Sequence, residues 1–180
     1  PYLAALGRAG QRVVTAILFY EPWGEQTHDL FDPMIETIKN VDGTWEYDYS
    51  VFDVYVELCA EYGIDKQINC FSMVPWDMKF RYWDEASASF QYIQTTTKTD
   101  EYRELWTNFL KAFKAHLLEK GWFEKTNIAM DERAESDMLN AYQIANALGF
   151  KMALAGNYHA SLCDKLQDFC VALGQDKKFT

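Results

Sequence analysis

The stretch TNIAMDERAESDM, residues 126–138, passes directly from a short apolar segment into an acidic one. The apolar segment, 126–130, is typical of a buried strand, whereas Glu135 and Asp137 are acids of the kind that favour the first turn of a helix. A strand followed by a helix is the repeating unit of a parallel sheet. The stretch therefore predicts an α/β fold, with Asp131 and Glu132 at the point where a strand ends.

The same alternation of strands and helices continues on both sides of this stretch. Apolar runs predict four further strands, at 12–20, 66–74, 150–156 and 167–173. Periodic apolar residues predict three helices, at 50–63, about 100–120 and about 135–148. Residues 1–11 resemble the last turns of a helix whose beginning lies before Pro1.

Two long connections interrupt the alternation, at 21–49 and 75–98. In the second, apolar and charged residues alternate over 78–83, which predicts a β-hairpin near 76–96. Both connections, and the shorter 157–160, follow the carboxyl end of a strand. In parallel α/β folds that end is where ligands bind.

The pattern favours a partial (β/α)8 TIM-like barrel. About five strands are visible, and no GxGxxG or GxxxxGK[ST] motif follows any of them. A complete barrel needs roughly 250 residues, and the chain has 180. We therefore expect one incomplete barrel domain over residues 1–180, with a smaller doubly wound sheet as the alternative.

Charge and composition exclude several classes of partner. The chain has 17 Lys and Arg against 27 Asp and Glu, a formal net charge of -10, which argues against nucleic acid and anionic membrane surfaces. No apolar run approaches the roughly 18 residues of a membrane span. The four cysteines lack metal-site spacing and are expected to be reduced and buried: Cys59, Cys70, Cys163 and Cys170. They leave the cellular compartment open, and a periplasmic or secreted location is included among the alternatives.

Asp131 and Glu132 raise a geometric question, because neighbouring residues within a strand face opposite sides of the sheet. The two acids can share one site only if the strand has ended and the backbone is turning. The alternative is that Asp131 caps the following helix and Glu132 is solvated.

Aromatic residues in or beside the connections favour a carbohydrate cleft over a phosphate or metal site, because sugar rings stack on aromatic faces. These residues are Trp23, Trp45, Trp76, Trp83 and Tyr158. The only histidines, His28, His116 and His159, form no HExxH motif, so no metal or other cofactor is expected. His116 is expected to be a surface or packing residue.

Five stretches, in this order, resemble glycoside hydrolase family 123, the β-N-acetylgalactosaminidases. They are YEPWGEQTHDLFD, DGTWEYDYSVFD, GIDKQINCFSMVPW, LLEKGWFEKTNIAMDER and LAGNYH. The resemblance implies a catalytic barrel whose remaining strands and accessory β-sandwich lie outside this chain. It also implies a retaining exo-enzyme acting on a glycan with a terminal β-linked N-acetylhexosamine.

In that family the substrate's own 2-acetamido group displaces the leaving group. The resemblance implies that Asp131 orients this group and that Glu132 acts as general acid and base. Ala134 departs from the family motif MDERP. A carbohydrate-binding barrel without turnover and a conventional two-carboxylate glycosidase are the alternatives.

Further residues are candidates for substrate binding. Asn157, Tyr158 and His159 are expected to line the mouth of the barrel, Trp76 to stack on the sugar and Trp23 to flank it. Arg133 either pairs with one of the two carboxylates or is an exposed residue at a helix start. Asn69 lies inside a strand, where it either reaches the site or only packs.

Overall fold

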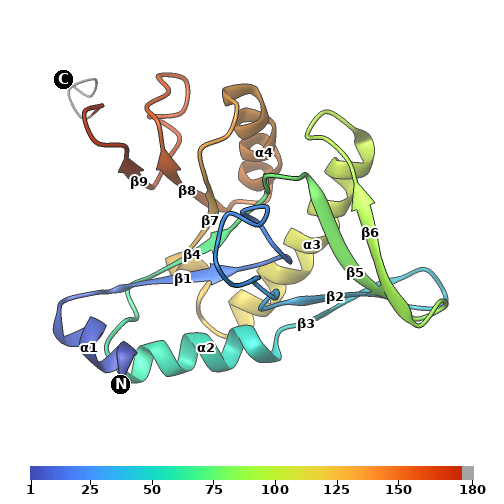
Figure 1. Cartoon of the computed structure of the whole chain (residues 1–180), viewed down its shortest axis with the longest axis horizontal. Coiled ribbons are helices and arrows are strands. Elements are labelled where there is room, and N and C mark those ends of the chain that lie inside the picture. The colour runs from blue at the N-terminus through green and yellow to red at the C-terminus, as the bar shows by residue number, and fades with distance from the viewer. Residues whose placement is uncertain (176–180) are drawn as a thin grey trace.

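The computed structural model describes residues 1–175 and contains a five-stranded parallel sheet (Figure 1). Its strands are β1 (Val13–Ile17), β4 (Gln67–Phe71), β7 (Thr126–Met130), β8 (Lys151–Gly156) and β9 (Asp168–Val171). They lie in the order β1-β4-β7-β8-β9, so their order in the sheet is the same as their order along the chain. A doubly wound sheet would reverse direction at a switch point. The uninterrupted order therefore confirms a partial TIM-like fold, with strands somewhat shorter than predicted.

The three predicted helices are present and connect successive strands of this sheet. They are α2 (Ser50–Glu61), α3 (Asp100–Glu119) and α4 (Glu135–Ala147). A short helix, α1 (Tyr2–Arg8), precedes β1, and a 3-10 turn, η1 (Phe123–Lys125), leads into β7. Figure 1 shows α2 running below β1 and β4, with α3 behind the sheet.

Helix α3 forms the centre of the apolar core. Thr99 caps its amino end by accepting a hydrogen bond from the Tyr102 backbone N–H at 3.2 Å. One face of the helix is buried, and its Trp106 ring lies 5.0 Å from Phe19 and 5.9 Å from Phe80, centroid to centroid. Phe19 follows β1 and Phe80 belongs to the second long connection. The aromatic stripe of α3 therefore fixes that connection against the sheet.

The two long connections form a second sheet, which Figure 1 shows to the right of the parallel sheet. Its strands are β2 (Glu36–Lys39), β3 (Trp45–Asp48), β5 (Lys79–Asp84) and β6 (Ser89–Gln94), in the order β3-β2-β5-β6. The β5–β6 pair is the predicted hairpin. The β2–β3 hairpin was not predicted. Its strands are only four residues long, and β2 gains its second partner, β5, from a segment more than 40 residues away, with Ile38 opposite Trp83.

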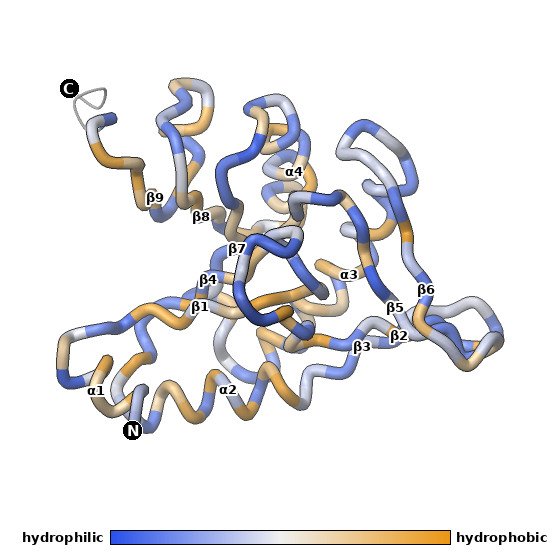
Figure 2. The backbone as a smooth tube through the Cα atoms, in the orientation of Figure 1, coloured by the Kyte–Doolittle hydropathy of each residue, from blue (hydrophilic) through white to orange (hydrophobic). Residues whose placement is uncertain are grey.

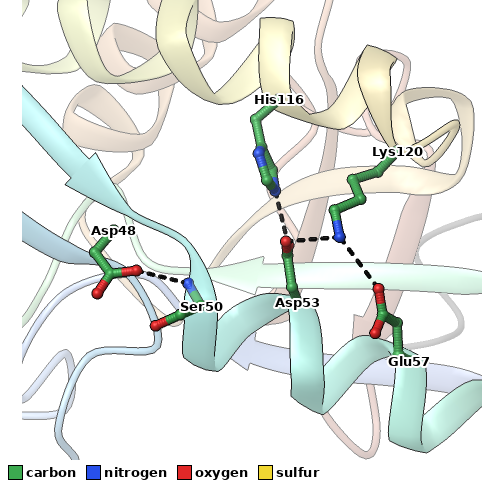
Figure 3. Close-up of polar contacts among 6 residues, drawn as sticks. All are labelled: Asp48, Ser50, Asp53, Glu57, His116 and Lys120. Carbon is green, nitrogen blue, oxygen red and sulfur yellow. Dashed lines mark hydrogen bonds and ion pairs between the residues drawn. The ribbon is translucent and has the colours of Figure 1, made fainter.

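Outside the core, a polar cluster joins α2 to α3 (Figure 3). Asp53 Oδ1 lies 2.7 Å from His116 Nε2, and Asp53 Oδ2 lies 2.8 Å from Lys120 Nζ, which also contacts Glu57 at 3.1 Å. The His116 ring stacks on Tyr49 at 4.0 Å. His116 is thus a packing residue, as predicted.

The cysteines are free but differ in burial. Cys59 and Cys70 are buried as predicted, whereas Cys163 is half-buried and Cys170 is exposed. The prediction of four buried cysteines was therefore wrong for these two. Cys170 lies on β9, the last strand of the sheet, where no further strand or helix in residues 1–175 covers it. Within the same residues, no helix combines the length and apolar character needed to cross a membrane.

Candidate active site

The loops that follow β1, β4 and β7 contact one another in the order of their strands. The Trp76 backbone N–H donates to the Pro22 carbonyl at 2.9 Å, and Arg133 Nη2 donates to the Trp76 carbonyl at 3.2 Å. The loop after β1 is mostly hydrophilic in Figure 2. The loops at the carboxyl ends of β1, β4 and β7 are therefore neighbours, on the side of the sheet where the sequence placed the connections.

Asp131 is the first residue after β7 and is half-buried. Its Oδ1 accepts a hydrogen bond from the Glu132 backbone N–H at 2.9 Å, and its Oδ2 accepts one from Trp76 Nε1 at 3.4 Å. Each oxygen of the carboxylate therefore has one donor. Asp131 does not cap α4, because its bond goes to the next residue while Ala134 is the residue before the helix.

Glu132 is exposed and lies over the end of β8. A Cβ placed on Gly156 would be 2.7 Å from Glu132 Cγ, closer than packing permits, and 3.3 Å from Glu132 Cα, which is a tight contact. The missing side chain at position 156 therefore makes room for Glu132. Sequence reasoning missed Gly156, although a glycine at a strand end often marks a close approach of backbone or ligand.

Trp76 connects the acidic pair to Arg133. The Arg133 guanidinium lies 4.5 Å from the Trp76 ring centroid, in cation–π geometry, while the indole N–H bonds Asp131. Among the described residues, Arg133 contacts Trp76 and forms an ion pair with neither carboxylate, and it is half-buried rather than exposed, so it matches neither of the two expectations. Its contacts hold Trp76 in place.

The remaining tryptophans divide between the two sheets. Trp23 lies beside the Trp76 loop, with its ring centroid 5.2 Å from Phe31 and 6.0 Å from Phe71, at the end of β4. Trp45 and Trp83 belong to strands of the second sheet, where Trp45 contacts Tyr82 and Trp83 contacts Phe90. Both tryptophans thus lie in the long connections, as expected, but on strands of the second sheet rather than in the loops that follow β1, β4 and β7.

The family model for the glycoside hydrolase 123 catalytic domain matches residues 1–180. This chain belongs to glycoside hydrolase family 123. The match extends over the whole chain and is to the catalytic domain of that family, as the resemblance implied.

A solved structure of a family 123 glycoside hydrolase from Clostridium perfringens, described in work on glycolipid glycan hydrolysis, has the same fold. It is 35% identical, has a TM-score of 0.91, and matches 97% of this chain. The matched region is 32% of the Clostridium chain, so this chain spans about a third of its length. A comparison with curated proteins finds no match.

In this family 123 chain, Ala134 stands where the family motif has proline. Ala134 has φ -59°, which is within the range that proline adopts. It precedes the first helical residue rather than lying inside the first turn. The alanine therefore keeps the loop conformation that a proline would impose.

The loop after β8 carries the three predicted substrate-binding residues, all half-buried. The amide of Gln175 bridges two of them: its Oε1 accepts from the Tyr158 backbone N–H at 2.8 Å, and its Nε2 donates to Asn157 Oδ1. The His159 carbonyl accepts from Cys163 Sγ at 3.2 Å. Burial, together with the Cys163 thiol, raises the pKa of the Tyr158 phenol. The loop beside Glu132 is therefore held by Gln175, which follows β9, and by its own Cys163.

Asn69 belongs to a polar network on the sheet. Its Oδ1 accepts from Asn127 Nδ2 at 3.0 Å, and its Nδ2 donates to Asp168 Oδ2 at 3.0 Å. Gln67 Nε2 donates to the same Asp168 oxygen at 2.7 Å. Asn127 precedes Asp131 by four residues on β7, so the network lies below the acidic pair. These contacts match the packing alternative for Asn69.

Among residues 1–175, no three His, Cys, Asp or Glu side chains lie close enough together to hold a metal ion. The described site offers two adjacent carboxylates: that of Asp131 accepts hydrogen bonds from two donors, and that of Glu132 is exposed.

Proposed function

We propose that this family 123 glycosidase is a retaining exo-β-N-acetylgalactosaminidase that uses the 2-acetamido group of its substrate as the nucleophile. The observation that supports this most directly is the unequal environment of the acidic pair. Asp131 is held by Trp76 and its own loop, as an orienting group must be, whereas Glu132 is exposed to an incoming glycan. Two consecutive residues with such different surroundings suit two different roles.

In the first step, the acetamido oxygen attacks the anomeric carbon and the bond to the leaving oxygen breaks. Glu132 transfers a proton to that oxygen as general acid. Asp131 accepts a hydrogen bond from the acetamido N–H and stabilises the positive charge that develops on the resulting oxazolinium. No enzyme atom bonds to the sugar.

In the second step, Glu132 removes a proton from water, and the water oxygen attacks the anomeric carbon. The carbon–oxygen bond of the oxazolinium breaks, which restores the acetamido group and returns Glu132 to its protonated form. Two inversions at one carbon retain the β configuration. The sum is the addition of one water across one glycosidic bond.

The surrounding residues suit the recognition of one terminal sugar. Trp76 has one ring face against Arg133 and is 36% exposed, so it can stack on a pyranose. Trp23 flanks the Trp76 loop, and Asn157, Tyr158 and His159 supply polar groups beside Glu132. Arg133 contributes by holding Trp76. A glycolipid glycan, as described for the Clostridium relative, is a candidate natural substrate.

The decisive experiment compares two aryl β-galactosides, one with the 2-acetamido group and one with a 2-hydroxyl, using the intact protein. We expect kcat/KM for the hydroxyl analogue to be lower by at least about 10³-fold, since it lacks the nucleophile. The gluco epimer of the acetamido substrate, assayed alongside, measures sugar preference. Comparable turnover of the 2-hydroxyl substrate, or an α-configured first product by NMR, would overturn the proposal in favour of another glycosidase mechanism.

Two isosteric variants separate the proposed roles. Glu132→Gln should reduce kcat on natural glycosides by about 10³-fold or more, and less on aryl glycosides whose leaving groups need little protonation. Asp131→Asn should reduce kcat on both to a similar extent. Equal activity of Glu132→Gln and the wild type, with sugar binding intact, would instead indicate a binding module.

A further inference from the structure

A second hollow of about 370 Å³ lies between the second sheet and α3, and it shares no residue with the proposed active site. Trp45, Tyr82 and Ile93 form its wall on the sheet side, and Glu101, Glu104 and Asn108 line it from α3. Its volume is within the range of small-molecule sites.

The hollow exists because the second sheet extends beyond the apolar stripe of α3. Phe80 and Tyr47 pack on that stripe, with Phe80 5.9 Å from Trp106 and Tyr47 5.2 Å from Phe109. Tyr82 and Trp45 are two residues farther along the same strands, so they point to the same side. The flank of α3 opposite them, however, is polar, with glutamates and an asparagine at helical spacing. Aromatic rings therefore face a polar wall across an open space.

The polar side chains around the hollow are not paired with one another or with other polar groups of the described residues. Throughout the described chain, the side chains of Glu101, Glu104, Asn108 and Lys39 and the Tyr82 hydroxyl form no hydrogen bond or ion pair. By contrast, the amides on the parallel sheet are paired with one another, as in the network around Asn69. The Lys39 ammonium lies 5.9 Å from the Trp45 ring centroid. Donors and acceptors are therefore both available to a ligand.

We infer that this hollow is a second, non-catalytic binding site for a pyranose residue of a glycan. The perpendicular Trp45 and Tyr82 rings, 5.1 Å apart and inclined at 73°, offer apolar faces to sugar C–H groups. The carboxylates, amide, phenol and ammonium suit hydroxyls, which both donate and accept. Two glutamates against one lysine disfavour a phosphate or other anion. The inference does not depend on the proposed reaction, because it uses none of the active-site residues.

The test follows the indole N–H resonances of the ¹⁵N-labelled intact protein during titration with galactose and with N-acetylgalactosamine. The Trp45 signal is assigned from its loss in Trp45→Phe. Its chemical shift should change with sugar concentration until the site is saturated, and the change should be the same in the Glu132→Gln variant. Trp45→Ala should raise the Kd of this site by at least about tenfold, roughly 1.4 kcal/mol, while hydrolysis of the aryl substrate is unchanged.

Two further variants keep the test decisive. Trp83→Ala alters the residue that follows Tyr82 on β5; the Trp83 side chain faces the opposite side of the sheet and contacts Phe90, so sugar binding should persist. Should Trp45→Ala fail to fold, the double variant Glu104→Ala/Asn108→Ala, on the exposed flank of α3, should weaken binding similarly. An unshifted Trp45 signal would overturn the inference, and so would wild-type sugar affinity in Trp45→Ala or in Glu104→Ala/Asn108→Ala. Either result would leave a protein partner as the alternative occupant of this surface.

Discussion

At the scale of single residues, the position of Glu132 depends on a side chain that is absent. The backbone of Gly156 is outside the left-handed region, so an alanine there would be acceptable conformationally. The obstacle is spatial, because the added Cβ would overlap Glu132 Cγ. Gly156 is therefore a positioning residue for the proposed acid and base.

We expect Gly156→Ala to displace Glu132 and to lower kcat on the order of 10²-fold, with a loss of about 1–3 kcal/mol in unfolding free energy. Steady-state kinetics and urea denaturation measure the two effects. The matched control is Gly121→Ala, after α3, where φ is +70° and nothing lies within 4 Å of the new Cβ. That variant should lose about 1–2 kcal/mol through backbone strain but keep its activity. Equal kcat in both variants would contradict the positioning role of Gly156.

At the scale of elements, the sheet-covering helices α2 and α3 are joined through Asp53. Its carboxylate accepts from His116 and Lys120, and its side chain is only 17% exposed, whereas that of Glu57 is 57% exposed. Hydrogen bonds to Asp53 and Glu57 raise the pKa of the Lys120 amine. The two acids thus share one partner, Lys120, but differ in solvent screening.

We expect Asp53→Ala to lower the unfolding free energy by about 1.5–3 kcal/mol, because it leaves the half-buried His116 ring without its charged acceptor. Glu57→Ala, the control on the same helix, should cost less than about 0.5 kcal/mol. Denaturation in low and high salt is the measurement, and the Asp53 effect should persist in salt. Equal losses for the two variants would show that the cluster is only a surface ion pair.

At the scale of the whole molecule, buried phenols make the packing between α3 and the two sheets sensitive to alkali. Burial raises the pKa of Tyr47 to about 12, and it also raises the pKa values of Tyr49 and Tyr102. An unfolded tyrosine ionises near 10.0. The folded state therefore holds these protons more tightly, so their contribution to stability is complete below pH 10.0 and is lost as the pH rises toward 12.

We expect unfolding free energy to fall steeply between pH 10 and pH 12, and Tyr47→Phe to make that fall shallower. Urea denaturation at a series of pH values measures the effect. Tyr2→Phe serves as the control, because Tyr2 is 86% exposed. A slope unchanged in Tyr47→Phe would show that its phenol ionises without unfolding the protein.

The elements that local patterns specify were predicted within a few residues. The helices at 50–63, 100–120 and 135–148 and all five parallel strands have strong periodicity and clear end signals. The β2–β3 hairpin lacks such signals, because its short strands depend on pairing with β5. The assignment of residues 1–180 as one incomplete catalytic domain stays a prediction, although one buried core includes residues of both sheets.

The sequence by itself determined the order of strands and helices and the location of Asp131 and Glu132 at a strand end, because strand termination and helix initiation are properties of neighbouring residues. Only the tertiary structure decided which side chains surround the pair. Trp76 meets Asp131 across 55 residues, Gly156 makes room for Glu132, and Trp45 and Trp83 lie in the other sheet. Contacts of this kind depend on how distant segments pack, and no local pattern encodes that.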